Sequence, residues 1–143
     1  MPDTEDEILQ LERDALDRCI KGDVQGFSEL YADDVSYFDP LTRARIDGSQ
    51  AMRVYQESLH EEGRMTRYEI ANADVVDAGT FALLTYNLTT YRLEPDASEA
   101  IDSCWNCTEV YRKDERWRII HSHWSHTAHE AFREPPVEGE AAS

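Results

Sequence analysis

The order in which hydrophobic periodicities occur along this chain constrains its fold more than any other feature of the sequence. A helical period comes first, between Glu5 and Ile20, where apolar residues recur at three- and four-residue spacing. From residue 66 onward, four strand-like runs follow one another, and only short turn sequences separate them. Connections this short favour antiparallel hairpins in a meander. Helices before a continuous meander predict an α+β domain and not an alternating βαβ fold.

Between the first helix and the meander, the sequence predicts two more helices and one strand. Asp23 is suited to cap a short second helix that ends near Tyr31, and Ser49 is suited to cap a third helix that ends before Gly63. Residues 35–39 alternate and stop at a proline, which predicts a strand that ends at Asp39. The N-terminal half is therefore expected to supply three helices that cover the sheet.

The later strands are expected at residues 66–76, 81–93, 100–113 and 116–125. The last residues of the chain lack any hydrophobic period and are rich in Pro, Glu and Ala. Such a composition does not support a packed core. We therefore expect a single domain over residues 1–130 and a disordered acidic tail over 131–143.

The composition excludes several classes of partner. The chain has 143 residues, which fits one domain, and its 30 acidic and 14 basic residues give a net charge of -16. This charge repels phosphate backbones and anionic lipid surfaces, so we expect no nucleic-acid or membrane partner. There is no signal-peptide pattern, and no window approaches the roughly 18 apolar residues of a membrane span. The three cysteines show no disulfide-framework spacing, so we expect free thiols and a cytoplasmic location.

Two histidines alternate on the last predicted strand. His121 and His123 should place both imidazoles on one face, roughly 7 Å apart. They could bind zinc or iron with a carboxylate such as Asp39 or Glu109, or they could line a ligand pocket and transfer protons near neutral pH. They could also satisfy only local hydrogen bonds. We favour the pocket interpretation, with neither a metal nor another cofactor.

Asp39 is the first candidate for a catalytic base. A pocket that desolvates this carboxylate would raise its pKa toward neutrality. Tyr37 precedes it by two residues and should lie on the same strand face. The alternative is a turn residue that caps local backbone amides, as Asp does readily before proline.

Aromatic side chains could line an apolar cavity while their polar tips orient a ligand. The candidates are Tyr37, Tyr55, Tyr86, Trp105, Trp117 and Trp124. Most of them could equally be core residues. Trp117 is expected to pack under the first helix, whereas Trp124 should lie on the opposite strand face, at a subunit interface. By the same alternation, Cys104 and Cys107 should point to opposite faces and cannot pair.

Particular segments resemble a known family. They are 37–40 leading to 47–48, then 108–112, and then 117–125 with its His-x-His. Over residues 5–126 the chain resembles the calcium/calmodulin-dependent protein kinase II association domain and its stand-alone bacterial relatives. The element order resembles the nuclear transport factor 2-like superfamily, which includes ketosteroid isomerases, SnoaL-like polyketide cyclases and scytalone dehydratases. The resemblance implies a cone-shaped curved antiparallel sheet, a pocket at its open end, and homodimers or rings.

Two functions follow from this resemblance. The first is a small-molecule pocket with isomerase, dehydratase or cyclase chemistry, in which Asp39 and His123 are catalytic. Its expected ligand contacts are Tyr37, Tyr55, Tyr86, Trp105, Glu109 and His121. Ketosteroid isomerase chemistry also needs a second, protonated acid, which the sequence alone does not assign. The second function is a non-catalytic homo-oligomeric module. Kinase activity is not expected, because the chain has neither a Gly-rich phosphate loop nor a His-Arg-Asp catalytic loop.

Overall fold

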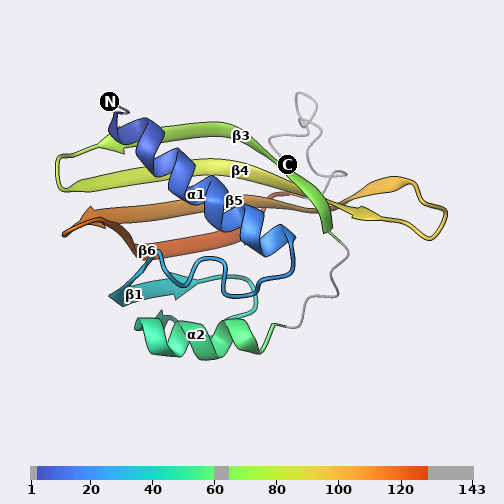
Figure 1. Ribbon diagram of the computed structural model, residues 1–143. Helices are drawn as coiled ribbons and strands as arrows, with labels where there is room; N and C mark the ends of the chain where they lie inside the picture. Colours follow the sequence, from blue (N-terminus) through green and yellow to red (C-terminus); the bar gives the residue numbers. More distant parts are fainter. Residues whose placement is uncertain (1–2, 60–64, 129–143) are drawn as a thin grey trace, which may run out of the picture.

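One curved sheet, with a long helix across it, forms the body of the protein (Figure 1). The computed structural model describes residues 3–59 and 65–128. The elements are α1 (Thr4–Ile20), β1 (Tyr31–Phe38), β2 (Ile46–Asp47), α2 (Ser49–Glu57), β3 (Met65–Asp77), β4 (Phe81–Leu93), β5 (Glu99–Lys113) and β6 (Trp117–His126). The strand order is β2-β1-β6-β5-β4-β3. The predicted α+β class is confirmed.

The helix α1 defines the two faces of the sheet. Its N-terminus is capped by Asp3, whose carboxylate accepts from the backbone N–H of Asp6 at 2.9 Å. The buried side of α1 contributes Ile8 and Leu16 to the core beneath it. We call the sheet face that α1 covers the inner face, and the opposite face the outer face. Within the described ranges, no helix combines the length and the apolar character needed to cross a bilayer.

The predicted second helix is wrong. Residues 24–30 form consecutive turns. In these turns the backbone N–H of Gly26 donates to the carbonyl oxygen of Asp23 at 3.0 Å, and that of Leu30 donates to Phe27 at 2.9 Å. A Cβ atom at Gly26 would lie only 2.7 Å from the carbonyl oxygen of Ala15. The segment therefore packs against α1 too closely for a helix with side chains all around it. Two helices, not three, occur in the described part of the chain, and β1 begins four residues earlier than predicted.

The meander is confirmed, and each of its four strands begins and ends within one residue of the prediction. The pairs β3–β4, β4–β5 and β5–β6 are antiparallel. The expected antiparallel sheet has one exception, because β1 pairs with β6 in parallel and places Tyr37 beside Ser122. The two-residue strand β2, which pairs with β1, was not predicted.

A β-bulge in β6 decides which side chains face α1. Tyr111 pairs with Ile119 and Val110 pairs with His121, so Ile120 is an extra residue in the ladder. An extra residue shifts the side-chain alternation by one position. After the bulge, the inner face receives Ser122 and Trp124, whereas His121 and His123 lie on the outer face. The prediction that Trp117 and Trp124 occupy opposite faces is wrong for this reason.

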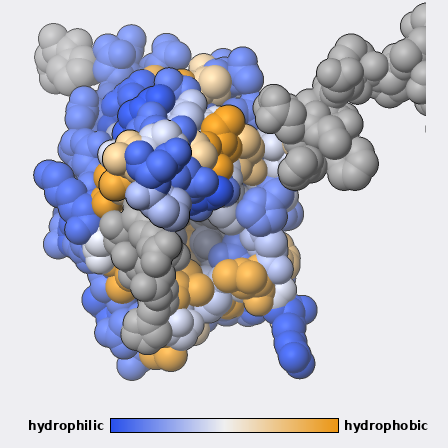
Figure 2. Space-filling view, turned by 90° about the vertical axis from the view of Figure 1, so that its right-hand side faces the viewer, coloured by the Kyte–Doolittle hydropathy of each residue, from blue (hydrophilic) through white to orange (hydrophobic). Residues whose placement is uncertain are grey.

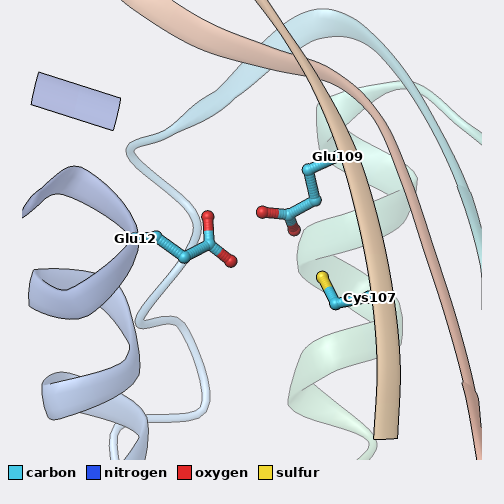
Figure 3. A group of neighbouring side chains, drawn as sticks. All are labelled: Glu12, Cys107 and Glu109. Carbon is cyan, nitrogen blue, oxygen red and sulfur yellow. The ribbon is translucent and has the colours of Figure 1, made fainter. Parts of the chain in front are cut away.

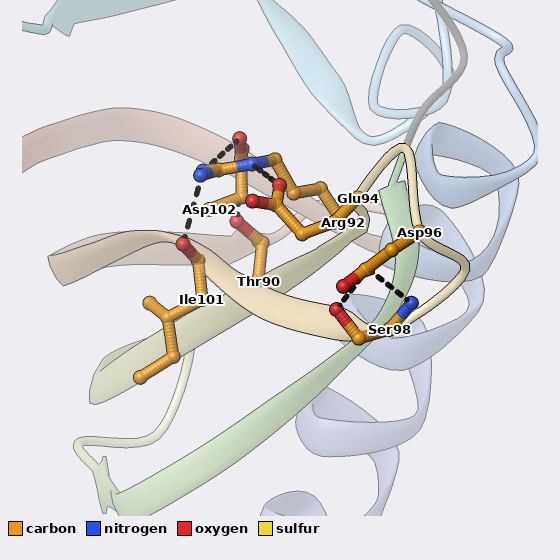
Figure 4. A network of polar contacts seen from close by, with 7 residues as sticks. All are labelled: Thr90, Arg92, Glu94, Asp96, Ser98, Ile101 and Asp102. Carbon is orange, nitrogen blue, oxygen red and sulfur yellow. Dashed lines mark hydrogen bonds and ion pairs between the residues drawn. The ribbon is translucent and has the colours of Figure 1, made fainter.

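The hairpin between β4 and β5 extends beyond the rest of the sheet and carries its own polar network (Figures 1 and 4). Arg92 donates to Glu94 at 2.8 Å and to the carbonyl oxygen of Ile101 at 3.1 Å. At the turn, Asp96 accepts from the backbone N–H of Ser98 at 2.9 Å. These local bonds stabilise the hairpin, and Thr66 and Arg67 of β3 add hydrogen bonds to Glu99 at 2.6 and 3.1 Å.

Candidate functional site

Two glutamates face each other between α1 and the sheet. Glu12 projects from α1 and Glu109 from β5, and both are 0% exposed (Figure 3). Cys107, two residues before Glu109 on the same strand face, is 2% exposed. One ligand atom from each of the three residues lies within 4.8 Å of the other two. The inner face thus encloses three acidic groups.

Two tyrosines hold the carboxylate of Glu12. The Tyr86 hydroxyl donates to Oε2 and the Tyr111 hydroxyl donates to Oε1, both at 2.6 Å. Burial raises the pKa of both hydroxyls well above the usual value, and the neighbouring Glu12 charge raises it further. Both tyrosines therefore remain hydrogen-bond donors at any physiological pH.

Glu109 is only partly satisfied. Its Oε2 accepts from Ser122 at 2.8 Å, and the Ser122 hydroxyl in turn accepts from Trp124 Nε1 at 2.9 Å. Its Oε1 is buried and accepts from no hydroxyl, amide or amine among the described residues. Burial, followed by the charge of Glu12 and a hydrogen bond shared between the two carboxyl groups, raises the pKa of Glu109 well above its ordinary value. The buried residues of the described ranges include no Lys, Arg or His to balance these acids.

Asp39 stands at the end of β1 with two further tyrosines. Its Oδ2 accepts from the Tyr37 hydroxyl at 2.8 Å and from the Tyr55 hydroxyl, which comes from α2, at 2.6 Å. Its Oδ1 accepts from the backbone N–H of Leu41 at 2.8 Å. Burial is the first cause that raises the pKa of each tyrosine. Asp39 thus caps the turn after β1 and also gathers two hydroxyl donors.

Tryptophans form an apolar corner near this end of the sheet. The rings of Trp105 and Trp124 lie nearly perpendicular, with centroids 5.9 Å apart, and His126 stacks on Trp105 at 4.1 Å. Both indoles are half-buried. The end of the molecule where β6 finishes faces the viewer in Figure 2, which shows a hollow near the centre of that surface. The corner and Asp39 both belong to this end of the inner face.

The structure does not bring Asp39 and His123 together. His121 bonds the Ser36 hydroxyl through Nδ1 at 2.7 Å, and Phe38 packs against both imidazoles with centroids 5.8 and 5.2 Å away. These contacts lie on the outer face, whereas Asp39 bonds tyrosines on the inner face. Among the described residues, neither histidine belongs to a group of three potential metal ligands. Of the predicted ligand contacts, Tyr86 and Glu109 meet at the buried acids, Tyr37 and Tyr55 meet at Asp39, and Trp105 lines the corner.

Sequence reasoning missed Glu12. This residue lies four positions after Ile8 and four before Leu16, so it interrupts the apolar stripe of the first helix. A glutamate on such a stripe must be buried when the helix packs on a sheet. That signal was present in the sequence and identifies the inner partner of Glu109.

A large groove lies at the opposite end of the molecule. It has a volume of about 720 Å³ and runs between α1 and the β5–β6 turn, with Leu30 and Trp117 among its lining residues and Asp14 and Lys113 at opposite walls. Neither Glu12 nor Glu109 lines it. The groove is therefore separate from the buried acids, which side chains enclose.

Comparison with known proteins identifies the family to which this fold belongs. A profile of the SnoaL-like domain family matches residues 8–129. A putative ketosteroid isomerase from Parabacteroides distasonis ATCC 8503 is 33% identical, with 88% of this chain and 89% of that chain covered and a TM-score of 0.76. An NTF2-like protein of unknown function from Pseudomonas putida KT2440 is 27% identical, with 91% of each chain covered and a TM-score of 0.74.

The association-domain resemblance extends to the fold. The association domain of C. elegans CaMKII is 20% identical, with 83% of this chain and 92% of that chain covered and a TM-score of 0.68. No curated protein matches the chain. The family match covers nearly all of the described residues, and the ketosteroid-isomerase-like structure agrees with it. This chain belongs to the family of SnoaL-like domains.

Proposed function

We propose that this protein binds a small, partly apolar organic molecule at the open end of the inner face and moves a proton on it. The observation that carries the proposal is the convergence of two tyrosine hydroxyls on one oxygen of Asp39. A carboxylate with hydroxyl donors beside it can remove a proton from carbon while a donor stabilises the oxygen that becomes negative. Isomerases, dehydratases and cyclases of carbonyl compounds share this step.

Each residue has a separate role in this proposal. Asp39 is the base, and Tyr55, which is less buried than Tyr37, donates its hydroxyl to a ligand oxygen in exchange for Asp39. Trp105 and Trp124 form the apolar wall that holds the carbon skeleton. His123 takes no part, because its side chain lies on the outer face. The name of the 33% identical structure, a putative ketosteroid isomerase, supports chemistry of this type.

Binding and turnover test the proposal together. The probes are 2-naphthol, whose hydroxyl can donate to Asp39, and cyclohex-3-enone, whose isomerisation to the conjugated enone is followed by ultraviolet absorbance. Loss of a charge-assisted hydrogen bond in Asp39→Asn should weaken naphthol binding about tenfold or more. Loss of the base should slow isomerisation about 10²-fold or more, and Tyr55→Phe should have a smaller effect on both.

The matched control is Tyr91→Phe, which removes an exposed hydroxyl that donates to Glu69. It should change neither binding nor turnover. The proposal is abandoned if Asp39→Asn leaves both measurements at the wild-type value, or if the wild-type protein acts on neither probe.

A second candidate, a homo-oligomeric module, is favoured by the apolar surface of the outer face. Val76 pairs with Leu83 and Leu83 with Val110, and the first two are 52% and 38% exposed. A row of apolar side chains on a sheet face is suited to contact a second copy of the chain. Sedimentation at micromolar concentration checks this, and a monomer there would exclude it.

A further inference from the structure

Three acidic side chains share one enclosed space on the inner face, and Asp39 is not among them. Figure 3 shows the carboxyl groups of Glu12 and Glu109 and the sulfur of Cys107 directed into the space between α1 and β5. The three ligand atoms lie within 4.8 Å of one another. Burial of acids without a counter-charge is costly, so a group that binds all three is expected to stabilise the fold.

The hydroxyl groups around the cluster donate to all but one of its carboxylate oxygens. Three of the four carboxylate oxygens accept a hydroxyl, from Tyr86, Tyr111 and Ser122. The fourth, Oε1 of Glu109, is fully buried and accepts from no hydroxyl, amide or amine among the described residues, so a proton shared with Glu12 or a cation must satisfy it. Carboxylates that bind a metal are typically oriented by such outer hydrogen bonds. Glu109 keeps one oxygen for a cation, and Glu12 would use the second lone pair of an oxygen that already accepts from a tyrosine.

We propose that Glu12, Cys107 and Glu109 form a binding site for a divalent cation of the zinc class. A thiolate among the ligands favours zinc or a similar soft cation over magnesium and calcium, which take oxygen ligands in larger numbers. Zinc bonds of about 2.0–2.3 Å require ligand atoms roughly 3.3–3.8 Å apart, so atoms that lie within 4.8 Å of one another need to close by at most about 1.5 Å. Three protein ligands leave the fourth position of a tetrahedral site for a water or a tyrosine hydroxyl.

The cation would join the helix to the sheet. Glu12 belongs to α1, whereas Cys107 and Glu109 belong to β5. Binding displaces the proton of the Cys107 thiol, together with any proton held by the Glu109 carboxyl, and these protons leave to solvent as the bonds to the cation form. Asp39 is not among the proposed ligands, so occupancy of this site and turnover at Asp39 can be measured separately.

Cobalt(II) provides a direct probe, because its thiolate complex absorbs in the near ultraviolet, where a carboxylate complex does not. The full chain, freed of metal with a chelator, is titrated with Co²⁺ both folded and during refolding, since the ligands are enclosed. We expect one equivalent to produce the thiolate band, and Zn²⁺ to abolish it. We also expect Zn²⁺ to raise the unfolding temperature of the wild-type protein.

Cys107→Ser should lose the band, whereas Cys104→Ser, three residues earlier and on the opposite strand face, should keep it. If Cys107→Ser fails to fold, Glu109→Gln serves instead and should weaken cobalt binding at least tenfold. Asp39→Asn should bind cobalt as the wild type does, which separates this site from the proposed function. The inference is overturned if no thiolate band forms under either condition, or if the band survives in Cys107→Ser.

Discussion

Acidic residues on the two faces of the sheet differ in burial and in the partners that they contact. On the outer face, Asp34 is exposed and pairs with Arg112 at 3.1 Å, and Glu69 similarly pairs with Arg67 at 3.0 Å. On the inner face, Glu109 lies only three residues before Arg112 on β5, yet it is fully buried and has no cation beside it among the described residues. One strand thus carries an exposed ion pair and an enclosed carboxyl.

The physical consequence differs between the faces. Exposed ion pairs are worth about 0–1 kcal/mol, because water screens the charges and the side chains lose freedom. An enclosed carboxyl must find donors, a proton or a cation, because burying its charge alone is far more costly. Each acidic group on the inner face therefore needs a specific partner, whereas those on the outer face are solvated by water. The outer face could contact a second copy of the chain without burying an unpaired charge.

The largest effect is expected from a pair of neighbouring leucines on β4. Leu84 is 0% exposed on the inner face, and Leu83 is 38% exposed on the outer face. Leu84→Ala should lower the free energy of unfolding by about 3 kcal/mol through lost burial and a cavity. Leu83→Ala should lower it by less than about 1 kcal/mol in a monomer. Chemical denaturation at two protein concentrations checks both values, and a concentration-dependent loss in Leu83→Ala would show that this leucine lies at a subunit interface.

A smaller difference in unfolding free energy is expected between the loss of a buried and the loss of an exposed tyrosine–glutamate hydrogen bond. Tyr86 donates to Glu12 in the core at 2.6 Å, and Tyr91 donates to Glu69 in an exposed position at 2.7 Å. Tyr86→Phe leaves a buried carboxylate oxygen without its donor and should cost about 2 kcal/mol. Tyr91→Phe exposes its acceptor to water and should cost less than about 0.5 kcal/mol. Equal costs in denaturant unfolding would contradict the contrast between the faces.

The sequence predicted the meander well because its information is local. Turn residues such as Gly79 mark where one strand ends and the next begins, and Gly79 indeed has a φ of 89° that favours glycine. The prediction of a second helix was wrong because Gly26 makes a tertiary contact: the absence of a side chain there permits close packing against α1. Periodicity within the segment carried no information about that contact.

The candidate site was predicted in part. The expected types of residue were named, including Asp39 with Tyr37, and the structure joins these two by a hydrogen bond. The structure places Asp39 and His123 on different faces of the sheet, because one extra residue, Ile120, reverses the alternation of β6. A bulge depends on how two strands meet, so alternation counted along one strand does not reveal it.

The smallest predicted effect concerns His121 on the outer face. Partial burial, followed by the charge of His123, lowers the pKa of His121 below its ordinary value. The unfolded chain therefore takes up this proton at a higher pH than the folded chain does. The contribution of His121 to stability is present above about pH 6.5 and is lost as the pH falls through the lowered pKa.

Replacement of this imidazole should remove that loss. Relative to the wild type, His121→Asn should lose less stability between pH 7.5 and pH 5.5, because it lacks the imidazole whose pKa is lowered in the folded protein. His123→Asn removes the second cause and should recover part of the same change. Denaturant unfolding of all three proteins at both pH values measures it. The prediction is contradicted if the wild type gains stability relative to His121→Asn as the pH falls. That result would mean that the folded protein favours the charged imidazole, and that a negatively charged group lies near His121 on the outer face.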